Sequence, residues 1–113
     1  MININKLRDN TRNNYFKNKD MMIKNFEKSN KDETQYLEDE IKKCSIKGIY
    51  NISINCNKLK DYKETKEYLM AKGFDIEIYD LSYYENILEY LLSKLNLNKD
   101  EVKDDDIYMY ISW

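Results

Sequence analysis

Residues 48–80, with the sequence GIYNISINCNKLKDYKETKEYLMAKGFDIEIYD, decide the fold of this chain. Apolar and polar residues alternate over 50–56 and again over 74–79, which is the two-residue period of a β-strand. Between these stretches the apolar residues recur at helical spacing from about Lys58 to Lys72, and Gly73 follows as a stop signal for the helix. This order predicts a strand–helix–strand unit whose right-handed crossover makes the two strands parallel.

Two further helices are predicted before this unit. A narrow apolar stripe indicates a helix from Tyr15 to Glu27, and residues 1–14 are so polar that we expect a mobile arm there. A second helix is expected to begin at Asp32, which forms a capping box with Gln35, and to end before Gly48.

A helix and a strand are predicted after the unit. Ser82 and Glu85 have the spacing of a second capping box, and the amphipathic pattern behind them continues to Leu95. An acidic loop over 98–106 then leads to a strand over 107–113. The helix would make this last strand parallel to the others, and the loop is also long enough to reverse its direction.

The predicted fold class is therefore α/β, or α+β if the last strand is antiparallel. We expect a basic N-terminal arm and helix over 1–31 and a single domain over 32–113. Strands that alternate in polarity are typically covered on one face only. Three tyrosines would lie on the uncovered face, where they either fit a half-exposed strand or form a recognition surface: Tyr79, Tyr108 and Tyr110.

The composition argues against several kinds of function. The chain of 113 residues has no histidine, so the commonest general base and metal ligand is missing. It also has no glycine-rich phosphate loop, and Cys44 and Cys56 are expected to be buried free thiols. No run of 18 apolar residues is present. We therefore expect a non-enzymatic protein without a cofactor or a membrane segment, located in the cytoplasm.

The charge is divided between the two ends of the chain. Residues 1–31 contain eight Lys or Arg and three Asp or Glu, whereas residues 73–113 contain three and ten. The basic arm is a candidate for binding a protein or a nucleic-acid backbone, with its ligand-binding side chains at Lys6, Arg8, Arg12, Lys17 and Lys19. The acidic candidates for partner binding are Asp75, Glu77, Asp104, Asp105 and Asp106, and their loop lacks the ligand spacing of a calcium-binding loop.

Two short motifs resemble small uncharacterised proteins of tailed phages and prophages. Lys72-Gly73-Phe74 precedes a strand, and Ile111-Ser112-Trp113 ends the chain. The resemblance covers residues 36–80 and 106–113. It implies a phage context, in which small non-enzymatic proteins assemble into particles or block host machinery, and it assigns no role to individual residues.

Three hypotheses of function follow. The first is an interaction protein that acts by protein–protein contact, as a virion or assembly component, in which the basic arm of one copy meets the acidic region of another. The second is an inhibitor of a host defence or nucleic-acid enzyme that uses an acidic surface. The third is a nucleic-acid-binding module that uses the basic arm.

Overall fold

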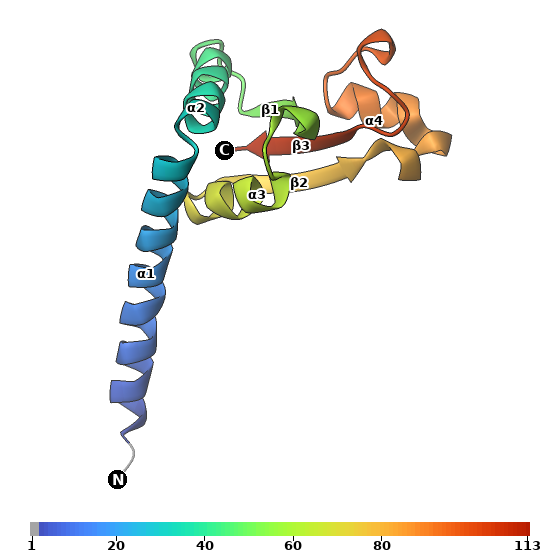
Figure 1. The fold of residues 1–113 in the computed structure, drawn as a ribbon. Helices are drawn as coiled ribbons and strands as arrows, with labels where there is room; N and C mark the ends of the chain where they lie inside the picture. The colour runs from blue at the N-terminus through green and yellow to red at the C-terminus, as the bar shows by residue number, and fades with distance from the viewer. Residues whose placement is uncertain (1–2) are drawn as a thin grey trace.

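The structure is a computed structural model that describes residues 3–113 (Figure 1). It shows an α+β fold in which helices surround a small antiparallel sheet. The helices of the described residues are α1 (Ile4–Ser29), α2 (Lys31–Ile46), α3 (Tyr62–Ala71) and α4 (Leu88–Lys94), and the strands are β1 (Asn51–Asn55), β2 (Asp75–Asp80) and β3 (Ile107–Ser112). Short 3-10 turns occupy Cys56–Lys58, Leu81–Tyr83, Glu85–Ile87 and Lys99–Glu101.

The strand order is β1-β3-β2, and β3 is antiparallel to both neighbours. The predicted strand–helix–strand unit is confirmed as β1, α3 and β2, and its two strands run in the same direction. They do not pair with each other, because β3 lies between them. The antiparallel alternative for the last strand is therefore the one that the structure adopts, which makes the fold α+β.

β3 is the central strand because both of its faces are apolar. Met109 and Ile111 are completely buried, and Tyr108 on the opposite face is 5% exposed. The central position of the sheet buries the most apolar area of such a strand, because it has a neighbouring strand on each side and a packed layer on each face.

The first face of the sheet is covered by α2, α3 and the end of α1. Leu37 of α2 and Leu69 of α3 form one buried cluster with Ile54, Met109 and Ile111 of the sheet. This cluster is the main core of the molecule.

The second face is not open, which corrects the prediction that helices cover one face only. Leu91, Leu92 and Leu95, from α4 and its C-terminal end, form a second buried cluster with Tyr108. The hydroxyl of Ser53 on β1 donates a hydrogen bond to the carbonyl of Leu95 at 2.8 Å. The sheet is thus the middle of three layers where α4 crosses it.

Three helices end in the same hydrogen-bonded motif. In each, a residue with positive φ follows the helix, and the next residue's N–H donates back to a carbonyl in the last turn, as in a Schellman motif. The positive-φ residues are Gly48 (φ 75°), Gly73 (φ 101°) and Asn96 (φ 56°). The returning bonds run from Ile49 to Cys44, from Phe74 to Leu69 and from Leu97 to Leu92, at 3.0, 3.1 and 2.9 Å.

Both predicted capping boxes are wrong. α2 begins one residue earlier than predicted, after Asn30, and Gln35 donates to Asp39 rather than back to the helix start. Ser82 does not cap a helix either, because its N–H and hydroxyl both donate to Asp80. The segment that follows forms 3-10 turns, so α4 begins only at Leu88.

Candidate protein-interaction surface

The N-terminal helix α1 is the most exposed element of the molecule. It is 26 residues long, and Asn3 caps it by accepting hydrogen bonds from the N–H groups of Asn5 and Lys6. The mobile arm predicted for residues 1–14 is therefore corrected for residues 4–14, which are helical, while residues 1–2 lie outside the described part. No described helix is both long and apolar enough to cross a membrane.

Only the C-terminal third of α1 packs on the domain. The ring of Phe26 stacks on Tyr68 of α3, with centroids 4.3 Å apart. The Tyr68 hydroxyl donates to Glu27 at 2.8 Å, and Lys72 lies 3.5 Å from the same carboxylate. Burial and the hydrogen bond to Glu27 raise the pKa of Tyr68, so its hydroxyl remains a donor at neutral pH. These contacts fix the direction in which α1 leaves the domain.

The first two thirds of α1 extend away from the rest of the molecule (Figure 1). Almost all side chains of this part are exposed, including apolar ones. Ile4, Leu7 and Tyr15 are 57%, 52% and 62% exposed. Their spacing places them on the same side of the helix as Phe26, which packs on the core. The stripe that anchors α1 thus continues with exposed side chains to Ile4, and Tyr15 also lines a hollow beside α3. We call Ile4, Leu7, Arg8, Arg12 and Tyr15 the α1 face.

The five cationic residues of the predicted basic arm lie on two different sides of α1. By helical spacing, Arg8, Arg12 and Lys19 flank the apolar stripe, whereas Lys6 and Lys17 lie on the opposite side. None of these five side chains forms an ion pair within residues 3–113. The two arginines, the only ones in the chain, therefore accompany the apolar stripe.

The three tyrosines predicted to lie on an uncovered face belong to the second cluster, with α4 packed against them. Tyr108 is buried, and Tyr79 and Tyr110 are half-buried around it. The ammonium group of Lys94 on α4 lies 5.1 Å from the Tyr79 ring centre and 5.8 Å from that of Tyr110. These rings pack a layer of the fold and do not offer an open stacking platform.

Lys94 also ties α4 to the edge strand β2. Its ammonium group lies 3.2 Å from the Glu77 carboxylate and 2.6 Å from the Tyr79 hydroxyl, which itself donates to Glu77. Hydrogen bonds donated by Tyr79 and, to a lesser extent, by Lys94 lower the pKa of Glu77. The hydrogen bonds of Lys94 with Tyr79 and Glu77 raise the pKa of Lys94. Burial and the hydrogen bond to Glu77 raise the pKa of Tyr79. Glu77, Tyr79 and Lys94 thus form a cross-link between β2 and α4 on the surface of the molecule.

The predicted acidic surface is not one patch. Asp75 pairs with Ser112 at one end of β2, whereas Asp106 accepts a hydrogen bond from Leu81 beyond the other end. A six-residue strand is about 17 Å long, which separates Asp75 from the loop of Asp104, Asp105 and Asp106. Glu77 is occupied by Lys94. The structure therefore distributes these five carboxylates over two ends of the sheet.

A different acidic surface lies on the start of α4, and the sequence pattern missed it. Glu85, Ile87, Glu89 and Tyr90 line a shallow open hollow of about 430 Å³, together with Lys99. Ile87 is 51% exposed and Tyr90 74% exposed. Ile87 belongs to the apolar stripe of the predicted helix, but the 3-10 turn before Leu88 rotates it out of the core. We call Glu85, Ile87, Glu89 and Tyr90 the α4 patch.

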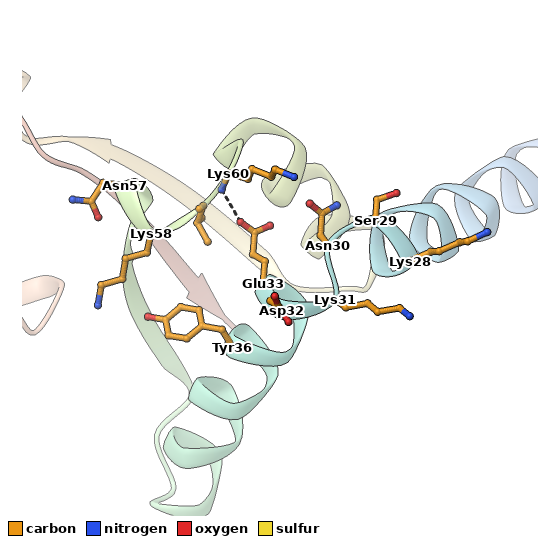
Figure 2. Close-up of a pocket in the computed structure, with 11 residues that line it drawn as sticks. Lys28, Ser29, Asn30, Lys31, Asp32, Glu33, Tyr36, Asn57, Lys58 and Lys60 are labelled. Carbon is orange, nitrogen blue, oxygen red and sulfur yellow. Dashed lines mark hydrogen bonds between the residues drawn. The ribbon is translucent and has the colours of Figure 1, made fainter.

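A hollow of about 820 Å³ lies where α1 meets α2 (Figure 2). Four lysines surround it: Lys28, Lys31, Lys58 and Lys60. Two carboxylates, Asp32 and Glu33, also line it. Glu33 accepts hydrogen bonds from the Lys60 N–H at 2.8 Å and the Thr65 hydroxyl at 3.0 Å, and thereby links α2 to the start of α3.

No group of three or more metal-ligating side chains comes together within residues 3–113. Cys56 is buried, and burial raises its pKa to about 12, so it is an unreactive thiol in the folded chain. No protein-family model matches the chain, and neither does any curated protein or solved structure compared with it.

Proposed function

We propose that this chain is a non-enzymatic interaction protein that acts by protein–protein contact, with the α1 face as its docking element. The observation that carries the proposal is the continuation of the apolar stripe of α1 beyond its last contact with the domain. In this proposal the protein is an assembly component, in the cytoplasm or in a particle. The likeness of the Lys72–Phe74 and Ile111–Trp113 motifs to phage proteins supports that setting.

Physical arguments support α1 as a recognition element. An isolated helix is only marginally stable in water. A partner that covers the exposed apolar residues of α1 would stabilise the helix, because it removes their apolar area from water. Amphipathic helices with anchors three and four residues apart are a recurrent means of protein recognition. The contacts of Phe26 and Glu27 hold α1 in a fixed direction, which reduces the entropy lost on binding.

The geometry favours this proposal over the two other hypotheses. An acidic mimic would need its carboxylates on one surface, but Asp75 and Asp106 lie at opposite ends of β2. A nucleic-acid arm would track one backbone with a continuous row of cations, but Arg8 and Arg12 lie on a different side of α1 from Lys6.

Site-specific photo-crosslinking in the native host tests the proposal. A photoreactive amino acid replaces Thr11, which lies within the stripe, and in a matched variant it replaces Asn13 on the opposite side of α1. Both positions are exposed. We expect illumination to join the Thr11 probe to a protein and give an adduct of discrete mass. We expect the Asn13 probe to give little adduct.

The adduct's composition decides between the hypotheses. Either a second copy of this chain or another protein joined through Thr11 supports the proposal. The absence of a protein adduct at Thr11 would overturn it, and so would equal labelling from both positions. Nucleic acid in the adduct would favour the basic-arm hypothesis instead.

A further inference from the structure

We infer that the partner of the α1 face is the α4 patch of a second copy of the same chain, so that copies associate head to tail. This inference depends on the proposed function, since it names the partner of the same docking element. It adds a second surface, at the start of α4, that none of the sequence patterns had indicated.

The two surfaces match in chemical character. The α1 face combines apolar side chains with Arg8 and Arg12, and the α4 patch combines Ile87 and Tyr90 with Glu85 and Glu89. Neither Glu85 nor Glu89 forms an ion pair within residues 3–113. The α1 face therefore combines apolar area with two positive charges. The α4 patch combines apolar area with two carboxylates, and Lys99 also lines its hollow.

The charges also match in number. Arg8 and Arg12 are four residues apart on α1, which places them on the same side, about 6 Å apart along the axis. Glu85 of the 3-10 turn and Glu89 of α4 line one hollow. Arginine can bind a carboxylate through two parallel hydrogen bonds, so two such pairs would fix the register of docking.

One copy cannot bring its own two surfaces together. In Figure 1, α1 leaves the domain on one side of the sheet and α4 lies toward the other. The stacking of Phe26 on Tyr68 holds α1 in that direction. Because the two surfaces differ, the contact is heterologous, and it produces either a ring or an open chain of copies.

Charge favours this arrangement over a pairing of two α1 helices. The segment up to residue 31 has an excess of five positive charges and residues 73–113 an excess of seven negative ones. Two basic helices would repel each other, whereas α1 on the α4 patch is attracted. The contact area is small, so we expect weak association, with a Kd on the order of 10–100 μM.

Sedimentation velocity with charge-reversed variants of the full chain tests the inference. Variant A carries Arg8→Glu and Arg12→Glu, and variant B carries Glu85→Arg and Glu89→Arg. Each is measured alone and in a one-to-one mixture, from about 1 μM to about 1 mM protein. All four positions are exposed, and circular dichroism verifies that each variant is folded.

We expect the wild-type chain to form larger species as its concentration rises, and high salt to weaken this association. Each variant alone should need at least about tenfold more protein to associate, because like charges then face each other. The mixture should recover association, since the reversed α1 of variant A fits the reversed patch of variant B, and the wild-type charges of each fit the other.

A control variant carries Lys17→Glu and Lys24→Glu, which change the net charge as much as variant A but lie on the other side of α1. We expect it to associate nearly as well as the wild type. An equal loss in this control would overturn the inference, as would a wild-type monomer over the whole range or a mixture that fails to recover. If the chain is monomeric and the Thr11 probe still captures another protein, the proposed function stands and the self-docking fails.

Discussion

Single residues at helix ends set the direction of the chain in this fold. Gly48, Gly73 and Asn96 each have positive φ and each reverse the chain after a helix. Gly73 has the largest φ of the three, at 101°, and a side chain placed there would meet no atom within 4 Å. The requirement for glycine at this position is therefore a backbone requirement and not a steric one.

Gly73→Val should lower the free energy of unfolding by more than about 1 kcal/mol, since a β-branched residue at positive φ is strained. Gly73→Asn should cost less, because asparagine tolerates this region better. Urea denaturation of both variants measures the difference. If the valine variant unfolds at the same urea concentration as the wild type, positive φ at Gly73 is not required.

The cross-link at Glu77 should make stability depend on pH. Its pKa is lowered in the folded chain, so the stability that it provides is present above its ordinary value of 4.5 and is lost as the pH falls through the lowered value. The difference in unfolding free energy between wild type and Glu77→Gln should therefore shrink below pH 4.5. Urea denaturation over a pH series measures it.

Tyr79→Phe provides the matched background for this test, because it keeps the ring and removes the hydroxyl that contributes most to the pKa shift of Glu77. In that background the effect of Glu77→Gln should be smaller at neutral pH. An effect of Glu77→Gln that is the same at all pH values would contradict the assigned role of the carboxylate.

At the scale of elements, α1 is one helix with two different environments. Its last third is held by Phe26 and Glu27, and the part before residue 19 consists of exposed residues. The other described helices each contribute buried side chains to one of the two core clusters. α1 therefore contributes to the stability of the domain only through its C-terminal part.

Removal of residues 1–18 should change the free energy of unfolding by less than about 0.5 kcal/mol, because residues 3–18 are all exposed. Phe26→Ala should lower it by about 1–3 kcal/mol, since a half-buried ring stacked on Tyr68 is removed. Urea denaturation at low protein concentration compares the two. A truncated chain as unstable as the Phe26→Ala variant would show that the front of α1 packs on the domain.

At the scale of the whole molecule, the projecting helix makes the chain elongated. The radius of gyration is 17.7 Å and the extents are 64 × 30 × 28 Å. A compact chain of this length would have a radius of gyration of about 13 Å. The length of the molecule separates a basic end from an acidic end, as head-to-tail association requires.

Small-angle X-ray scattering of the dilute chain at high salt should give a radius of gyration near 17.7 Å for the monomer. Removal of residues 1–18 should lower it to about 14 Å, close to the value for a compact domain. High salt suppresses the association of charged surfaces, so the monomer is the species observed. A value of about 13 Å for the full chain would show that α1 folds back on the domain.

The elements with local sequence signals could be predicted from the chain alone. The alternation in 50–56 and 74–79 and the stop at Gly73 predicted β1, α3 and β2, and the structure confirms all three. Glycine at a helix end and the period of apolar residues depend on a few neighbouring residues, so they can be recognised from the chain alone. Arg8 and Arg12 were likewise identified as candidates, but Ile4 and Leu7 were assigned to a polar mobile arm, and the continuation of the helix to residue 4 was not predicted.

The pairing of these elements depends on tertiary packing. β3 lies between β1 and β2, where both of its apolar faces are buried, and α4 covers Tyr108 on the face predicted to be open. The same packing rotated Ile87 outward and placed Asp75 and Asp106 at opposite ends of the sheet. The free energy of such contacts comes from surfaces that are far apart in the chain, and no local pattern contains that information.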